Sequence, residues 1–382
     1  MQRDIKERFL KTYKLLKMDK KIITSISMLL IFGAFLLINN CKDTDKKSSE
    51  TEIQKIVYAS DVIPFFDYWK LILGDGSNAG FANNFENKDF FYTANDNHGN
   101  WVVFKSPNAG NTHGTSNNTR TELAQAKKWY PKTANDKLAA TLKVMQVSET
   151  GDARVAASYA VVVGQIHSAD GHENEPLKIF YKKFPGHTKG SVFWHYEINT
   201  EGDDNSRRWD YSTAVWGNDF SVVGTEENTY PEEPKDGIAL GEEFSYEIEV
   251  KDGIMTLKFT SEDHETKAFT KNLIESQYTT TADIPEQTQK LFVPIGQDGL
   301  ERKHAYAGEG CFFKLGCYNQ TNGKSPEVNK NWCSGAETHG GDIQKQYADG
   351  NYAEVWFKTA SIYVSDAAVS NEDYFSKNDK IK

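Results

Sequence analysis

The fold class follows from one stretch of sequence, which reads Phe244-Ser-Tyr-Glu-Ile-Glu-Val250, Lys251-Asp-Gly253, Ile254-Met-Thr-Leu-Lys-Phe259. Apolar and polar residues alternate on both sides of an Asp-Gly pair, a pattern typical of two antiparallel strands joined by a tight turn. Successive side chains of a strand point to opposite faces, so each strand would bury one face and expose the other. The stretch therefore predicts a β-hairpin within an antiparallel sheet.

Similar strand-like runs, separated by turn residues, recur along most of the chain. They are Trp69–Leu73, Trp101–Phe104, Lys137–Gln146, Ser158–His167, Leu177–Tyr181, Ser191–Asn199, Cys311–Gln320 and Tyr352–Tyr363. The one helix that we expect is a short one around Phe269–Gln277. Many strands without strand–helix alternation predict an all-β fold: a concanavalin-like jelly-roll β-sandwich of two antiparallel sheets, with a groove on the concave sheet.

The first 41 residues differ in composition from the rest of the chain. A basic pair precedes the uncharged apolar run Ile22–Ile38, which is typical of an export signal. Cys41 follows and resembles the lipidated Cys of a bacterial lipobox, although Asn40 stands where a small residue is usual. We therefore expect an exported protein, either a cell-surface or outer-membrane lipoprotein lipidated at Cys41 or a secreted one. Membrane contact would be through the lipid anchor or an uncleaved signal.

The remaining sequence divides into a tether, one folded domain and a tail. Residues 42–55 are polar and predict a flexible linker. No second linker interrupts residues 56–367, so we expect one domain there, followed by a polar C-terminal tail over 368–382. We expect the protein to be a monomer.

The exported part is strongly acidic. The chain has 44 Lys and Arg against 54 Asp and Glu; the first 41 residues hold 8 and 3 of these, which leaves 36 and 51, a net charge of about −15. This argues against nucleic acid as a partner, because phosphate binding depends on clustered basic side chains. A polyanionic substrate would need a local strip of basic residues.

Three cysteines remain when Cys41 is set aside, an odd number in a compartment where disulfides persist. Cys311 and Cys317 lie roughly 20 Å apart along one predicted strand, too far for a disulfide. We expect a Cys317–Cys333 disulfide, with Cys311 as a buried thiol. The alternative pairs Cys311 with Cys333.

Three segments carry candidate chemistry. In Ser158–His167, alternation puts Gln165 and His167 on one face with Val161 and Val163, roughly 7 Å apart along the strand. An isolated Gln-x-His of this kind would more often be a strand that emerges into solvent.

The second segment, Cys311–Gln320, aligns Lys314, Tyr318 and Gln320 on one face across a glycine. A cation, a phenol and an amide over a glycine suit a sugar-binding surface, although an exposed Lys and Tyr would explain the pattern equally well. In the third segment, Asn118–Leu123, Arg120 and Glu122 share a face. Such a pair is usually a salt bridge, but the Glu could also hold the guanidinium toward a substrate carboxylate.

Together the three segments resemble the alginate lyases of polysaccharide lyase family 7. The family motifs R-T/S-E-L-R, Q-I/V-H and Y-F-K-x-G-x-Y-x-Q match Arg120–Leu123, Gln165–His167 and Phe312–Gln320, in the same order. Weaker likeness extends from Trp69 to Phe357. Two positions depart from the motifs: Ala124 replaces the second Arg, which removes a cation, and Phe312 replaces Tyr. We expect Phe312 to point away from Lys314 and Tyr318 and to matter little.

The resemblance implies that the protein cleaves alginate or a similar polyuronate by β-elimination, without metal or cofactor. It assigns catalysis to Arg120, Gln165, His167 and Tyr318, and substrate binding to Glu122, Lys314 and Gln320. Arg120, Gln165 and His167 would neutralise the uronate carboxylate, and Tyr318 would protonate the leaving oxygen. Tyr318 could also be the base toward mannuronate, whereas His167 is the natural base toward guluronate. The Q-I-H form of the second motif favours guluronate-containing substrates.

Two long segments, Gly296–Gly310 and Thr321–Asn351, flank the predicted catalytic strand. Loops of this length are usually functional. They could close one end of the groove, and the cation missing at Ala124 would weaken the grip on a long chain. Both features favour exolytic action.

Other functions have less support. A jelly-roll glycoside hydrolase needs paired carboxylates, and Glu247 and Glu249 alternate with apolar residues as in an ordinary half-buried strand. A non-catalytic saccharide-binding module would not need all four catalytic residues. A metal site at His167, His172 and Glu173 matches no common ligand spacing.

Overall fold

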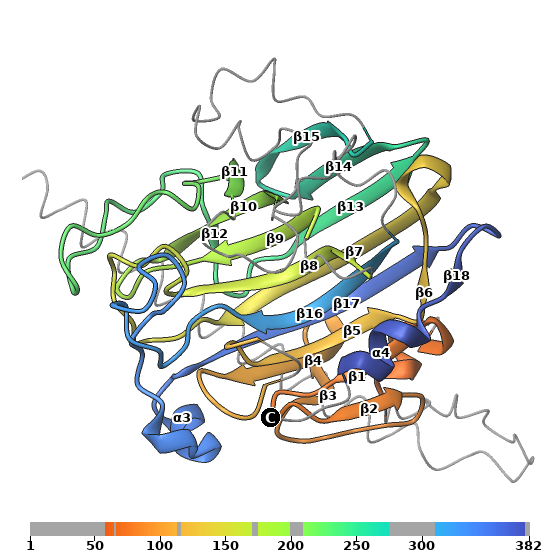
Figure 1. The fold of residues 1–382 in the computed structure, drawn as a ribbon. Helices are drawn as coiled ribbons and strands as arrows, with labels where there is room; N and C mark the ends of the chain where they lie inside the picture. The colour runs from red at the N-terminus through yellow and green to blue at the C-terminus, as the bar shows by residue number, and fades with distance from the viewer. Residues whose placement is uncertain are drawn as a thin grey trace, which may run out of the picture. The chain divides into compact units, whose positions relative to one another are not determined.

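Two antiparallel β-sheets pack face to face in the residues that the computed structural model describes, which are 58–64, 66–112, 116–169, 175–198, 209–274 and 310–378 (Figure 1). Residues 1–57, with the expected export segment, Cys41 and tether, lie outside the described residues. The same holds for His172, Glu173 and most of Gly296–Gly310. No helix among the described residues is long and apolar enough to cross a membrane.

The larger sheet has nine strands in the order β11-β10-β9-β8-β16-β5-β1-β2, with β12 paired to β10. Its strands are β1 (Trp69–Ile72), β2 (Asn78–Phe81), β5 (Arg120–Gln125), β8 (Ala160–Ser168), β9 (Leu177–Lys182), β10 (Lys189–Ile198), β11 (Trp209–Trp216), β12 (Ile238–Ala239) and β16 (Cys311–Asn319). All the pairings in this sheet are antiparallel.

The second sheet has seven strands in the order β15-β14-β13-β7-β17-β4-β3. Its strands are β3 (Phe91–Asp96), β4 (Gly99–Pro107), β7 (Asn135–Gln146), β13 (Phe244–Lys251), β14 (Ile254–Ser261), β15 (His264–Asn272) and β17 (Tyr352–Tyr363). A two-stranded sheet joins β6 (Lys127–Lys128) to β18 (Val369–Ser370). The short helices are η1 (Ala59–Asp61), η2 (Phe66–Tyr68), η3 (Pro131–Thr133), η5 (His339–Gly341), α3 (Ile343–Ala348) and α4 (Glu372–Asn378).

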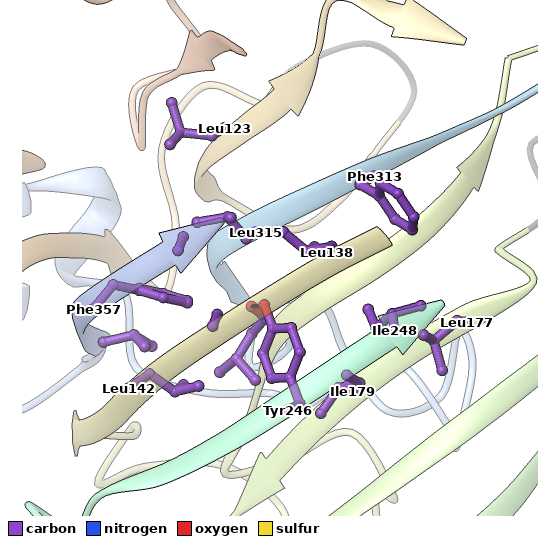
Figure 2. Packing of buried hydrophobic residues seen from close by; sticks show 14 of the residues in the cluster. Leu123, Leu138, Leu142, Leu177, Ile179, Tyr246, Ile248, Phe313, Leu315 and Phe357 are labelled. Carbon is purple, nitrogen blue, oxygen red and sulfur yellow. Dashed lines mark hydrogen bonds between the residues drawn. The ribbon is translucent and has the colours of Figure 1, made fainter. Parts of the chain in front are cut away.

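The core lies between the two large sheets and is built from the apolar face of each. Leu315 and Phe313 of β16 face Leu142, Ile248 and Phe357 of the other sheet (Figure 2). Tyr246 is also fully buried there, and its hydroxyl donates a hydrogen bond to the Val163 carbonyl at 3.1 Å. The jelly-roll β-sandwich expected from the alternation is therefore confirmed.

The hairpin that predicted the fold forms as expected between β13 and β14. Lys251 pairs with Ile254, so the turn consists of Asp252 and Gly253 alone. Both residues have positive φ, 48° and 82°, as a type I′ hairpin turn requires.

The helix expected around Phe269 is wrong over the described part of that segment, because Phe269 lies within strand β15. The residue packs against Trp194 and Phe259 at the edge of the core. One of these contacts is with the neighbouring strand β14 and the other with β10 of the larger sheet, so tertiary packing overrides the local sequence preference.

Part of the expected polar tail belongs to the folded domain. Strand β18 pairs with β6, and helix α4 follows it and lies beside β1 and β5 (Figure 1). Phe375 of α4 is only 2% exposed and packs against Ala124 and Phe312. The helix is held by an ion pair between Lys70 and Glu372 at 2.8 Å.

The expected Cys317–Cys333 disulfide is absent among the described residues, where Cys311, Cys317 and Cys333 are all buried and none forms a disulfide with another. Cys317 faces the core between the sheets, where burial raises the pKa of its thiol. Cys333 follows Trp332, which packs on Phe220 and over Lys178 on the outer face of the larger sheet. The two thiols therefore lie on opposite sides of that sheet.

Candidate active site

The three motif segments lie on neighbouring strands at the centre of the larger sheet. Strand β16 is between β8 and β5, and Lys314 pairs with Gln165 on one side and with Ala124 on the other. Tyr318 pairs with Arg120 in the same way. Residues nearly 200 positions apart in sequence are thus brought onto one outer face.

Irregularities in β8 and β16 set which side chains reach that face. The register of β8 shifts between Val162 and Gly164, and Val163 points into the core with Val161. The expectation that both valines share a face with Gln165 and His167 is therefore wrong. The bulge reverses the alternation ahead of Gln165, so Gln165 and His167 do share the outer face, as expected.

Four charged or polar side chains form the Glu122 cluster, defined here as Arg120, Glu122, Gln165 and Lys314. Lys314 Nζ lies 2.7 Å from Glu122 Oε2, and the nearest guanidinium nitrogen of Arg120 lies 3.6 Å from the same oxygen. Gln165 Nε2 donates to Glu122 Oε1 at 2.5 Å. Glu122 therefore holds three side chains, which is more than the Arg120 contact expected from the sequence.

Four polar atoms of this cluster have no aligned hydrogen bond among the described residues: Arg120 Nε, Glu122 Oε2, Lys314 Nζ and Gln165 Oε1. Glu122 Oε2 and Lys314 Nζ lie 2.7 Å apart and form an ion pair, which leaves Arg120 Nε and Gln165 Oε1 without a partner. Buried polar atoms without partners are costly, so their presence indicates a ligand that completes them. Arg120 Nε is a cationic donor, which suits an anion.

Burial and charge act differently on the two cations. Burial lowers the pKa of Lys314 to about 8, against the opposing effect of Glu122. Burial also disfavours the charged guanidinium of Arg120, but Tyr318 and Glu122 hold its pKa above the ordinary value. Arg120 therefore stays charged at every relevant pH, whereas Lys314 can lose its charge in mild alkali.

Tyr318 lies against Arg120, with the guanidinium carbon 3.8 Å from the ring centroid. Its hydroxyl is 3.2 Å from Ser116 Oγ, a contact that no sequence motif predicts. Tyr318 is only partly buried, unlike the residues of the Glu122 cluster. Its phenol is therefore placed beside a fixed positive charge and remains accessible.

The backbone carbonyl of Ser168 fixes the tautomer of the His167 ring. Nδ1 is 2.6 Å from the carbonyl oxygen of Ser168, which can only accept, so Nδ1 carries the proton in the neutral ring. Nε2 is then the basic nitrogen, and Glu175 Oε1 lies 3.4 Å from it. Burial lowers the pKa of His167 to about 4, although Glu175 opposes the shift. The imidazole is therefore neutral and able to accept a proton at neutral pH.

Phe312 corrects another expectation. Its side chain shares the outer face with Lys314 and contacts the His167 ring, with the centroids 5.2 Å apart. It was expected to point away, but alternation along β16 puts residues 312, 314 and 318 on the same side. Gln320 is buried and its Nε2 donates to the Tyr318 carbonyl at 3.3 Å.

Several residues around the site were missed in the sequence. Tyr374 of α4 contacts the rings of both His167 and Phe312, and Glu175 contacts His167. Trp332 packs on Phe220, which covers Phe180 and Phe193 beside Tyr318. All come from segments without a recognisable motif, and only their aromatic or acidic character could have drawn attention.

The carboxylates considered for a glycoside hydrolase lie on β13 of the second sheet and not on the larger sheet. Glu247 lies on β13 of the other sheet and pairs with Lys137 at 2.5 Å and with Lys258 at 3.6 Å. No group of three or more His, Cys, Asp or Glu side chains in the described part of the chain is arranged to hold a metal ion.

Comparison with known families matches residues 63–364 to the alginate lyases. The chain belongs to the alginate lyases of polysaccharide lyase family 7. It is therefore a polysaccharide lyase whose substrate is alginate.

Solved structures of other alginate lyases have the same fold. One is an exolytic alginate lyase of this family from Zobellia galactanivorans, which is 63% identical with a TM-score of 0.74 over 82% of this chain and 99% of its own. The alginate lyase of Klebsiella pneumoniae has a TM-score of 0.55 at 21% identity, over 81% and 99% of the two chains. In a sequence search, an alginate lyase of Klebsiella pneumoniae is 27% identical over 280 residues, 64% of this chain and 76% of that protein.

Proposed function

We propose that this alginate lyase cleaves its substrate through Arg120, Gln165, His167 and Tyr318, with Lys314 and Glu122 completing the binding of the uronate carboxylate. The observation that carries the proposal is a buried guanidinium donor without a partner, Arg120 Nε, next to the buried Lys314 ammonium and beside a neutral imidazole and an accessible phenol. A saccharide-binding module would have no use for a buried, neutral base beside an anion site.

The Glu122 cluster would meet the main chemical difficulty of the reaction. Loss of the proton at C5 places a second negative charge on a group that is already anionic, so the proton is only weakly acidic. Arg120 and Lys314 would stabilise this charge in a site that is shielded from water. Gln165 donates to Glu122, so its free Oε1 is an acceptor. It would bind a sugar hydroxyl and hold Glu122 in place.

The proton transfers follow from the two remaining groups. The base removes the C5 proton, the electron pair of that bond forms the C4–C5 double bond, and the C4–O4 bond breaks. Tyr318 gives its phenolic proton to O4. Toward guluronate, His167 Nε2 takes the C5 proton while the Tyr318 phenol protonates O4. Toward mannuronate, Tyr318 would begin as the phenolate, take the C5 proton and give that same proton to O4. No water is consumed, and one product carries the new double bond.

We further propose that the enzyme acts exolytically. The solved alginate lyase that is 63% identical is described as exolytic, and it is matched over 99% of its length. Residues 321–351 supply additional support through Trp332. The centroid of its ring lies 5.0 Å from the ring centroid of Phe220 and 5.3 Å from Lys178 Nζ. These side chains cover β9 and β10 on the outer face and would limit how far a polymer extends there.

Polymer viscosity and ultraviolet absorbance of the unsaturated product, followed together, test both parts. We expect absorbance to rise while viscosity falls slowly, with short products from the start. Absence of new absorbance would contradict a lyase. A steep early fall in viscosity, with mid-sized oligomers first, would contradict exolytic action and leave the lyase chemistry intact.

A preference for guluronate-containing alginate is proposed because the second motif has the Q-I-H form. Export is proposed from residues 1–41, with Cys41 as the lipidation site and the monomer as the working form. Mass spectrometry of the mature N-terminus from the native membrane fraction would test lipidation; a chain that retains residues 1–40 would contradict it.

A further inference from the structure

Helix α4 lies against the reacting centre, although it lies beyond the family match, which ends at residue 364. Phe375 anchors it in a small apolar cluster with Ala124, Phe312 and Ala169. Ala124 stands where the family motif has Arg, and this small side chain leaves room for Phe375. Asn371, just before α4, donates through its backbone N–H to the Ala126 carbonyl at 3.0 Å.

This docking brings Tyr374 to the catalytic imidazole. The Tyr374 ring centroid lies 5.5 Å from that of His167 in an edge-to-face arrangement and 4.6 Å from that of Phe312. Phe312 also contacts His167, with the two ring planes tilted by 32°. The imidazole therefore packs against two aromatic rings, one from β16 and one from the C-terminal helix.

We propose that Tyr374 is a positioning residue for the lyase reaction, which, together with Phe312, fixes the His167 ring and keeps water away from it. The inference rests on the proposed role of His167 as base. Edge-to-face contacts between rings are directional, so they restrict rotation of the imidazole. The Ser168 carbonyl fixes one nitrogen, and the two aromatic rings fix the plane of the ring.

The charged groups around His167 make the effect on its proton affinity predictable. Glu175, before β9, favours the imidazolium, whereas Lys314 of β16 and Arg120 of β5 disfavour it. Burial is the largest influence and keeps the pKa of His167 near 4. Admission of water through loss of the Tyr374 ring should move this pKa up toward its ordinary value of about 6.5.

The test compares Tyr374→Ala and Tyr374→Phe in the full-length protein. We expect Tyr374→Ala to lower kcat on polyguluronate by between about tenfold and a hundredfold with KM within about twofold, because geometry is lost and not binding. In a plot of kcat against pH, the fall on the acid side should move to higher pH in Tyr374→Ala. Tyr374→Phe should have the wild-type kcat and the wild-type position of this fall. Tyr363→Ala, an exposed tyrosine on β17, is the matched control.

Three outcomes would overturn the proposal: wild-type kcat and pH profile in Tyr374→Ala, a raised KM with the fall on the acid side unmoved, or the same defect in Tyr374→Phe. If Tyr374→Ala does not fold, Tyr374→Leu replaces it, with nuclear magnetic resonance of the histidine rings as a function of pH and His167→Gln for assignment. A His167 titration that is unchanged in Tyr374→Leu would also overturn it. This readout does not depend on His167 being the base, so failure of the proposed mechanism is recognised separately by His167→Ala.

Discussion

Among single residues, His167 and Tyr318 should differ in how their loss depends on the substrate. We expect His167→Ala to reduce turnover of polyguluronate by several orders of magnitude and turnover of polymannuronate much less, because Tyr318 can act as the base only toward mannuronate. Tyr318→Phe should reduce both severely. Initial rates on the two block polymers decide this, with thermal unfolding to show that each variant folds. Equal, slight losses on both polymers in His167→Ala would remove it from the mechanism.

Lys314 should give the reaction an alkaline limit in substrate binding. Its pKa near 8 lies below the ordinary value, so the ammonium is present below that pH and is lost as pH rises through it. KM for alginate should therefore rise above about pH 8. Lys314→Gln should have a high KM at all pH values without this rise. A wild-type KM that stays constant from pH 7 to 10 would show that Lys314 does not bind the carboxylate in its charged form.

At the scale of a strand, the irregularity in β16 requires Gly316. Its φ is 146°, and a Cβ there would lie 2.4 Å from the Thr121 carbonyl oxygen and 2.8 Å from Glu122 Cα, both backbone atoms of β5. We expect Gly316→Ala to destabilise the protein by about 2–4 kcal/mol and to reduce kcat, because β16 must move away from β5. Urea unfolding measures the first and initial rates the second.

Gly99→Ala is the control that separates backbone strain from a steric clash of the added Cβ. Gly99 has a similar φ of 122°, but nothing lies within 4 Å of an added Cβ. It should cost about 1–3 kcal/mol at most and leave kcat unchanged. Equal effects of the two substitutions on activity would mean that close contact between β16 and β5 is not required by the site.

The same irregularities mark how far the sequence could predict the molecule. Alternation correctly placed Arg120 and Glu122 on one face of β5, because that strand is regular throughout. It failed for Val163, where an extra residue reverses the alternation and no local signal announces it. Helix α4 was missed because most of its residues are polar, and its burial depends on Phe375 meeting Ala124 and Phe312 from distant strands.

For the whole molecule, the absence of a disulfide among the described residues predicts stability that does not depend on redox conditions. Cys317 faces the sandwich core and Cys333 belongs to the segment on the other side of the sheet, so neither can reach the other without rearrangement. We expect the same melting temperature with and without a reductant. Alkylation in denaturant, without prior reduction, should modify Cys311, Cys317 and Cys333. A protein mass that corresponds to two cysteines left without the alkyl group would contradict this expectation.

The central place of β16 between β8 and β5 also has a consequence for folding kinetics. Its partners precede it by roughly 150 and 190 residues, so these pairings close very long loops, and contacts of this kind form slowly. Strands β13 and β14, joined by a two-residue turn, can pair early and without the rest of the chain. During refolding, catalytic activity should therefore return with the slowest phase, after most of the strand structure of the second sheet is in place.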